Sequence, residues 1–217
     1  MRTALSIQAH PDRPIAQRLH ASQPSVYKDP NPKPEVAVAL TNDFAACFGF
    51  ATPQTVAENF SGSPTLQSII AECTGGQYQE CLPDDVDWLT KMVDGLFNFL
   101  DKNPERLAIV IAGLKAECEQ VEPAARSLHQ KFCLVLIEQY GNDVGVVFTF
   151  LMNIVMPGAG KWFLIDAGVP HCYLQGELME IMVNSDNVVR GGLTPKLKDI
   201  DTLIEILPYN SRAEPSV

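Results

Sequence analysis

The chain has 217 residues, of which 46% are hydrophobic and 19% are charged, and this composition excludes an intrinsically disordered or fibrous protein. The 26 acidic residues outnumber the 16 lysines and arginines, which gives a formal net charge of −10. An acidic chain argues against nonspecific binding to nucleic acid or to an anionic membrane, because both of those partners attract basic surfaces.

The apolar segments and the cysteines argue against a membrane-spanning protein and against a zinc site built from thiolates. The longest apolar stretch, residues 144–156, is too short to span a bilayer. The six cysteines contain no CxxC pair, so a zinc site built from thiolates has no support. The first residues lack the pattern of a secretory signal, so we expect reduced cysteines and a cytoplasmic protein without a membrane partner.

The first fifty residues predict a loop followed by a strand. Prolines in the polar stretch 24–34 exclude a central helix or strand there, because proline removes a backbone hydrogen-bond donor. The apolar segment 36–40 follows directly and predicts a buried strand. An amphipathic helix is expected after Pro14, and residues 8–10 are expected to be extended.

Residues from about 52 to 143 predict helices. Hydrophobic residues recur at three- and four-residue spacing over 86–100, which is typical of an amphipathic helix. A capping residue, a proline and an acid at 103–105 indicate the start of the next helix. We expect a third helix from about 122 to 141, ending at a glycine, and a loop over 74–76.

Short strands are predicted in the last third of the chain. Glycine turns near 157–160 and 166–168 separate the apolar segments 162–165 and 171–174, and residues 178–183 form another candidate strand. Strands therefore precede and follow a helical segment, so the two β parts must pair across it. This order favours an α+β protein with an antiparallel sheet or barrel.

Two of the four histidines lie where a metal ion could be bound. His10 and His171 each lie at the end of a strand-like segment beside a proline, whereas the other two histidines fall within predicted helices. Gln8 and His10 are two residues apart and would share one face of a strand. Together with Glu35 they would form a site of nitrogen and oxygen ligands suited to zinc or a similar divalent ion. Spacing alone makes this a weak signal, since scattered histidines and glutamates are common.

A second cluster over residues 186–196 combines two adjacent glycines with Arg190 and Lys196. Glycines permit close approach of the backbone, and the cations could hold a phosphate. From these residues alone, an ordinary glycine turn with solvated charges is the preferred interpretation.

Five motifs in a fixed order resemble one known family. They are Ser6-Ile-Gln-Ala-His10-Pro-Asp12, Tyr27-Lys-Asp-Pro-Asn31, Lys33-Pro-Glu35, Pro170-His-Cys-Tyr-Leu174, and Ser185-Asp-Asn-Val-Val-Arg190 with Gly192-Leu-Thr-Pro-Lys196. Together they closely resemble type I phosphomannose isomerase, a zinc-dependent cupin family. The resemblance extends over nearly the whole chain, although the helical middle matches in character more than in residues.

The resemblance implies a fold and a domain organisation. The fold is α+β, a partial cupin-like antiparallel β-barrel (jelly roll) with an inserted α-helical subdomain. Residues 1–50 would form the first part of the cupin-like catalytic domain, residues 51–143 the helical insert, and residues 144–217 the returning strands.

The resemblance also implies a function. The chain would be a zinc-dependent aldose–ketose isomerase that interconverts mannose 6-phosphate and fructose 6-phosphate through an enediol and supplies mannose for GDP-mannose and glycan synthesis. One alternative is a noncatalytic zinc- or sugar-phosphate-binding cupin fragment with a regulatory or assembly role. Another is a helical interaction module whose β parts do not close.

Roles are carried over residue by residue from the matching motifs. One Zn²⁺ per chain would be bound by Gln8, His10, Glu35 and His171. The expected catalytic residues are Arg190, Asp186 and Lys33, and the expected residues of the sugar-phosphate pocket are Ser6, Glu180 and Lys196. Asp186, Lys33 and Glu180 are all candidates for proton transfer, and the sequence does not choose among them.

The chain also departs from the family pattern. Compared with the family it looks shortened at both ends, which predicts a missing barrel wall, an exposed apolar face and a possible partner chain that covers it. Pro32 stands where the family has a histidine, and Trp162 stands where a smaller aliphatic residue is usual.

Overall fold

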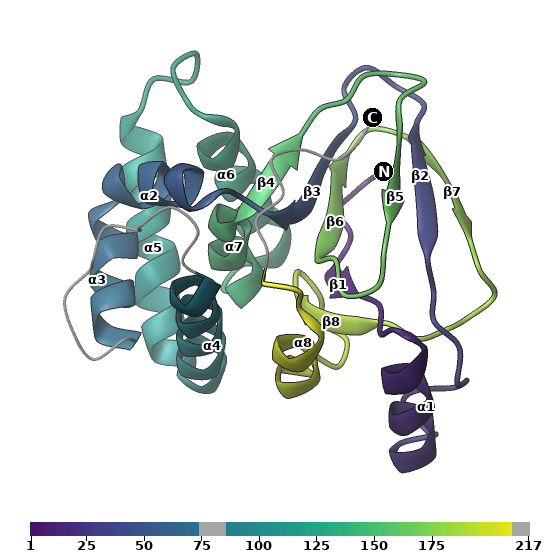
Figure 1. The fold of residues 1–217 in the computed structure, drawn as a ribbon. Helices are drawn as coiled ribbons and strands as arrows, with labels where there is room; N and C mark the ends of the chain where they lie inside the picture. The colour runs from purple at the N-terminus through teal and green to yellow at the C-terminus, as the bar shows by residue number, and fades with distance from the viewer. Residues whose placement is uncertain (74–85, 210–217) are drawn as a thin grey trace.

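Two antiparallel sheets and a layer of helices make up the computed structural model, which describes residues 1–73 and 86–209 (Figure 1). The strands are β1 (Ile7–Ala9), β2 (Glu35–Ala39), β3 (Ala45–Phe50), β4 (Met152–Val155), β5 (Trp162–Ile165), β6 (His171–Gln175), β7 (Leu178–Met182) and β8 (Val189–Gly192). The helices are α1 (Arg13–Ser22), α2 (Pro53–Ser61), α3 (Pro64–Cys73), α4 (Val86–Lys102), α5 (Pro104–Gln120), α6 (Leu128–Tyr140), α7 (Val144–Phe148) and α8 (Ile200–Ile206), with a 3₁₀ turn, η1, at Thr149–Leu151.

Strands from the two ends of the chain pair with one another. The larger sheet has the order β4-β3-β6-β1-β8, and the smaller sheet has the order β5-β2-β7. In both sheets the early strands lie between late ones, and the pairs are antiparallel. The α+β prediction is therefore confirmed, with a partial barrel of two sheets. The division of the chain into a helical insert between residues 50 and 143 and two flanking β parts stays a prediction.

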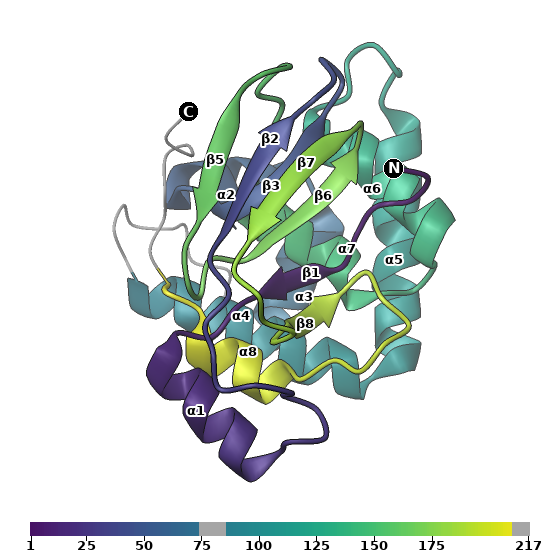
Figure 2. The same cartoon turned by 90° about the vertical axis from the view of Figure 1, so that its right-hand side faces the viewer.

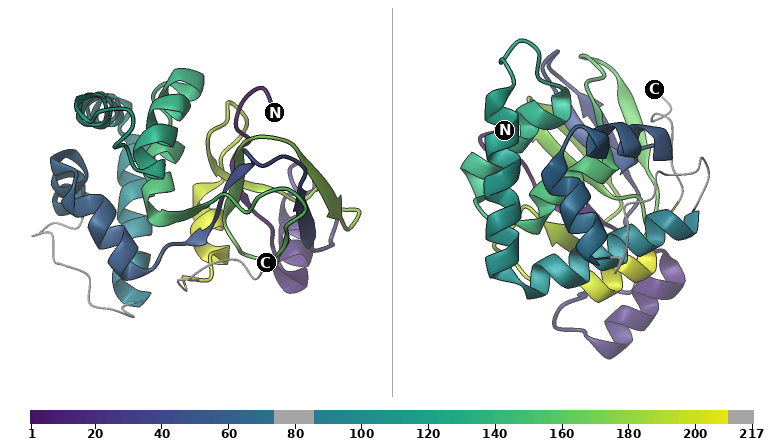
Figure 3. Two further views of the ribbon diagram at one scale, coloured as in Figure 1. Left: turned by 90° about the horizontal axis from the view of Figure 1, so that it is seen from above. Right: turned by 90° about the vertical axis from the view of Figure 1, so that its left-hand side faces the viewer.

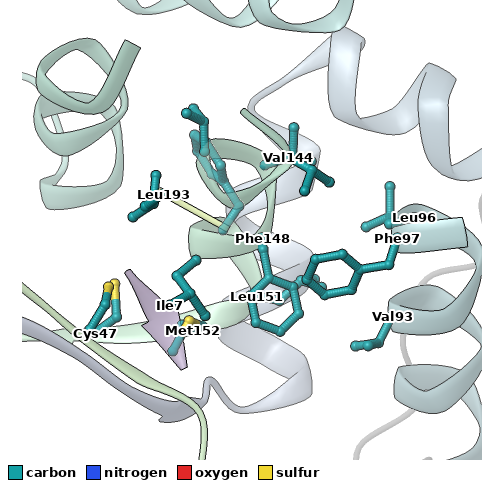
Figure 4. Close-up of a cluster of buried hydrophobic side chains, with 14 of the residues drawn as sticks. Ile7, Cys47, Val93, Leu96, Phe97, Val144, Phe148, Leu151, Met152 and Leu193 are labelled. Atoms are coloured by element: carbon teal, nitrogen blue, oxygen red, sulfur yellow. The ribbon is translucent and has the colours of Figure 1, made fainter. Parts of the chain in front are cut away.

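The larger sheet separates two hydrophobic cores. One face packs against the helices, where Ile7 of β1 lies near Phe97 of α4 and Phe148 of α7 (Figure 4), the last two with ring centroids 4.5 Å apart. The opposite face and the inner face of the smaller sheet enclose a second core that contains Phe48 and Phe163. Figure 2 shows the smaller sheet in front of the larger one.

Helices α2 to α7 gather on one side of the sheets, whereas α1 lies apart from them (Figure 3). Helix α5 begins at Pro104, directly after Asn103, as the sequence predicts. Helix α6 ends at Gly141, whose φ of +62° is the left-handed value that the prediction required. Residues 74–76, predicted to be a loop, lie outside the described residues.

The predicted start of α6 near residue 122 is wrong by several residues. The helix begins at Leu128 because Ser127 and Gln130 form a capping box, in which each side chain accepts a hydrogen bond from the other residue's backbone N–H. Residues 122–125 instead form a turn closed by a hydrogen bond from the Ala125 N–H to the Glu122 carbonyl.

Two further segments differ from the sequence-based expectation. The glycine-rich segment after residue 186 is not only a turn, because residues 189–192 form strand β8 beside β1. The apolar stretch 144–156 folds as α7, η1 and then β4, and its helical part is fully buried. Strand β3 and helix α8 were not predicted individually.

The outer face of the smaller sheet is apolar and exposed, as the resemblance predicts. Val36 of β2 lies opposite Leu164 on one side and Ile181 on the other, so these three side chains share a face. The exposed fractions on this face reach 52% for Trp162, 45% for Leu164, 48% for Met179 and 58% for Ile181. In the described ranges, no helix has the length and apolar character that crossing a bilayer requires.

Candidate metal centre

The strand register places three predicted site residues in one row. Gln8 on β1 lies opposite His171 on β6 and opposite Arg190 on β8. Residues directly opposite one another in antiparallel strands carry their side chains on the same face. Phe48 of β3 continues this row beside His171 and belongs to the core between the sheets. The row therefore faces the smaller sheet.

Glu35 reaches this row from the first residue of β2 in the smaller sheet. Its Oε1 lies 3.2 Å from Nε2 of His10, and its Oε2 lies 3.4 Å from Nε2 of His171. The three side chains are fully buried, and the ligand atoms they offer all lie within 4.8 Å of one another. Gln8 borders the group, with its Nε2 3.4 Å from Nε2 of His171.

Backbone carbonyl groups fix the orientation of both imidazole rings. Nδ1 of His10 lies 2.8 Å from the carbonyl oxygen of Asn187, and Nδ1 of His171 lies 2.9 Å from that of Val169. A carbonyl oxygen can only accept, so each Nδ1 must carry the proton and donate it. The Nε2 atom of each ring then faces Glu35. This is the arrangement by which proteins orient histidine ligands of metal ions.

Within the described part of the chain, three buried polar atoms of the centre lack a hydrogen-bond partner. Among the described residues, His10 Nε2 and both carboxylate oxygens of Glu35 have no hydrogen-bond partner, although they lie at ion-pair distances from one another. Unpaired buried acceptors are costly, and a bound cation would satisfy all of them at once. Two neutral imidazoles and one carboxylate form a donor set that fits zinc.

The protonation states agree with this donor set. Burial lowers the pKa of His10 from its ordinary value, which favours the neutral ring. Burial alone would raise the pKa of Glu35, but its interactions with His10 and His171 lower it, which favours the carboxylate. A neutral ring and an ionised carboxylate are the forms that bind a metal ion.

Lys33 is the cation nearest to this group. It lies two residues before Glu35, and its Nζ is 3.1 Å from Oε1 of Glu35. Its side chain retains 13% of its exposure, so the amine lies at the rim of the centre. Lys33 therefore balances part of the charge of the buried carboxylate.

Glu180 and Tyr173 form a second pair beside the centre. Glu180 lies on β7 opposite Ala37, and the hydroxyl of Tyr173 donates to its Oε1 at 2.5 Å. Burial raises the pKa of Glu180, and the charge of Glu35 adds to this effect against the lowering by the Tyr173 hydrogen bond. The structure thus brings Glu180 to the edge of the centre.

The remaining predicted residues lie farther from the ligand atoms. Ser6 is half-buried just before β1, whereas the side chains of Asp186 and Lys196 are exposed. Among the described residues, no hydrogen bond or ion pair joins these three side chains to the histidines or to Glu35. Arg190 is half-buried and reaches the row only through its register with Gln8.

Asn187 contributes to the metal centre, although its role was not predicted from the sequence. It is fully buried, and its carbonyl holds the ring of His10. Its only signal in the sequence is its place between Ser185 and Arg190 in a recognised motif, because a backbone contact leaves no side-chain pattern.

Comparison with known proteins finds similarity to one family. Residues 1–52 match the model of the phosphomannose isomerase type I catalytic domain. Mannose-6-phosphate isomerase from Bos taurus is 35% identical over 211 residues, which cover 95% of this chain and 50% of that protein. The chain is a relative of the type I phosphomannose isomerases. The resemblance inferred from the five motifs is thereby confirmed.

Solved structures of phosphomannose isomerases also match the fold. A point mutant of the enzyme from Salmonella typhimurium superposes with a TM-score of 0.78 at 27% identity, over 97% of this chain and 52% of that one. A zinc-bound mannose 6-phosphate isomerase gives a TM-score of 0.77 at 27% identity, over 97% and 52%. The chain spans about half the length of the relatives that it matches.

Proposed function

We propose that this chain binds zinc through His10, Glu35 and His171 and isomerises mannose 6-phosphate and fructose 6-phosphate. The observation that carries the proposal is the convergence of two buried imidazole nitrogens and a buried carboxylate within 4.8 Å of one another. The names of the relatives supply the substrate, and the zinc-bound neighbour supplies the identity of the metal.

Gln8 would complete the ligand set through its amide oxygen. The amide nitrogen lies 3.4 Å from Nε2 of His171, and rotation of the terminal amide exchanges its oxygen and nitrogen positions. A bound zinc ion would act as a Lewis acid for the sugar oxygens during isomerisation.

The reaction moves one proton between adjacent carbons. A base removes the proton from C2 of the open-chain aldose, and the C–H electron pair forms the C1–C2 double bond while the C1=O π pair moves to O1, which takes up a proton to give the enediol. The O2 proton then leaves as the C2=O bond forms, and the C1–C2 π pair takes a proton at C1. Of the three expected proton-transfer residues, Lys33 and Glu180 border the centre, whereas Asp186 is exposed. We therefore expect Lys33 or Glu180 to carry the proton.

Cations around the centre suit an anionic substrate. Arg190 lies opposite Gln8, on the other side of β1 from His171, and would stabilise negative charge that develops on the sugar oxygens. Ser6 and Lys196 stay predicted phosphate contacts. A cytoplasmic location stays a prediction from the missing secretory pattern. A role in GDP-mannose and glycan synthesis stays a prediction from the resemblance, as does a partner chain on the apolar face, which no comparison supports.

Turnover by the purified chain tests the proposed function. We expect interconversion of the two sugar phosphates that is lost on treatment with a chelator and restored by zinc. Glu35→Gln should abolish turnover, because it removes the only anionic ligand. Glu117→Gln is the matched control, since Glu117 is a hydrogen-bonded carboxylate in the helical layer, and it should leave turnover unchanged.

The opposite result identifies the alternative function. A folded, zinc-loaded chain without turnover would contradict the isomerase proposal. It would leave the noncatalytic zinc- or sugar-phosphate-binding protein as the better description.

A further inference from the structure

Hydrogen bonds beside the metal centre join two loops that are far apart in the sequence, residues 29–31 and residues 185–187. Nδ2 of Asn187 donates to the carbonyl oxygens of Asp29, at 2.6 Å, and Asn31, at 2.9 Å. The hydroxyl of Ser185 donates to the same Asn31 carbonyl at 3.1 Å, and the Asp186 N–H donates to Oδ2 of Asp29 at 2.9 Å. We call these five residues, Asp29, Asn31, Ser185, Asp186 and Asn187, the clasp.

One side of the clasp contacts a metal ligand directly. The carbonyl oxygen of Asn187 accepts the proton of His10 Nδ1 at 2.8 Å, and both residues are fully buried. The position of this carbonyl therefore decides where Nε2 of His10 points.

The other side of the clasp leads to the second ligand by a short, stiff connection. Only residues 32–34 separate Asn31 from Glu35, and two of these three residues, Pro32 and Pro34, are prolines. Proline fixes φ near −65°, so a displacement of Asn31 is transmitted to Glu35 rather than absorbed.

The contacts of Asn187 differ from those of a residue that only fills space. Its amide nitrogen donates to two carbonyls of the opposite loop, while its Oδ1 has no hydrogen-bond partner among the described residues. A buried acceptor without a partner costs free energy, and an apolar residue would avoid that cost. This position therefore requires the N–H donors of the Asn187 amide.

We propose that Asn187 is a positioning residue that fixes His10 and Glu35 relative to each other before the metal ion binds. The inference rests on the proposed metal site and deepens it. Preorganised ligands bind a metal ion more tightly because less conformational freedom is lost on binding.

Titration of the full chain with Co²⁺ tests this role, because the absorption spectrum of cobalt reports the ligand geometry independently of activity. Asn187→Ala removes the donors, and Asn187→Asp removes them while keeping the shape. We expect both variants to bind Co²⁺ about 10- to 100-fold more weakly, as is typical when an outer partner of a ligand is lost, and to show an altered spectrum at saturation.

Asn59→Ala is the matched control. The amide of Asn59 also joins two segments, donating to the Phe150 carbonyl at 3.0 Å and lying 3.5 Å from Nε2 of His129, but it does so in the helical layer. This variant should bind Co²⁺ with the affinity and spectrum of the unmodified chain.

The other outcomes separate the two proposals. Affinities and spectra of both Asn187 variants that match the unmodified chain would overturn the clasp and leave the metal site intact. An equal loss in Asn59→Ala, or failure of both Asn187 variants to fold, would assign Asn187 to general stability and overturn the positioning role. Absence of Co²⁺ binding by the unmodified chain would overturn the metal site, and the clasp with it.

Discussion

The histidine rings and the carboxylate of the centre are held by groups that do not belong to the ligand set. The carbonyls of Asn187 and Val169 orient the two rings, and Lys33 contacts the carboxylate of Glu35. Each ligand atom is thus positioned before any metal ion is present. Bringing unpaired acceptors together costs free energy, but it leaves the site preformed for a metal ion.

Lys33 provides a test at the scale of single residues. Lys33→Met keeps much of the aliphatic stem but leaves the buried Glu35 without its cation, so the metal-free chain should lose about 1–3 kcal/mol of unfolding free energy. The same change should strengthen zinc binding, because the amine no longer competes for Oε1.

Chemical denaturation and zinc titration measure these two opposite effects. Lys115→Met is the control, because Lys115 forms an exposed pair with Glu119 at 3.9 Å, and such pairs contribute about 0–1 kcal/mol. An unchanged stability of the metal-free Lys33→Met chain would contradict the account of the Lys33–Glu35 pair.

Residue chemistry alone predicted the type of the site and its candidate ligands, but only as a weak signal. The strand periodicity placed Gln8 and His10 on one face, and the donor types indicated a divalent ion. The roles of Arg190, Asp186 and Lys196 came only from the resemblance, and the structure leaves Asp186 and Lys196 exposed. Asn187 escaped notice because it acts through its backbone carbonyl.

At the scale of elements, local signals determined the helix ends better than the strands of the site. The start of α5 and the end of α6 follow from a proline and a glycine, whose backbone preferences are local. The predicted start of α6 near residue 122 is wrong because the Ser127–Gln130 capping box begins the helix at Leu128. Strand β8 was missed because its glycines resemble a turn, and only pairing with β1 makes it a strand.

The capping box supplies a prediction for α6. Ser127→Ala removes the acceptor for the Gln130 N–H and should lower the unfolding free energy by about 1 kcal/mol, measured by denaturant titration. Asn103→Ala should cost less, because the Asn103 side chain makes no capping hydrogen bond to α5, and the hydrogen bond that it donates to the Phe99 carbonyl at the end of α4 is exposed. Equal losses in the two variants would contradict this assignment.

At the scale of the whole molecule, the candidate centre exists because the two ends of the chain share a sheet. Strand β1 lies between β6 and β8, so residues near position 10 meet residues near 171 and 190. Composition and periodicity do not specify such distant pairing, and the ordered motifs supplied it instead. The apolar outer face near Ile181 was also expected from the resemblance and not from local pattern.

Metal analysis of the purified full chain, combined with thermal unfolding, tests the central claim most directly. The account predicts about one zinc ion per chain and a midpoint of unfolding that rises with added zinc and falls on chelation, because zinc binds the folded state in preference to the unfolded one. A folded chain that retains no zinc, and whose unfolding midpoint does not respond to added zinc, would contradict it.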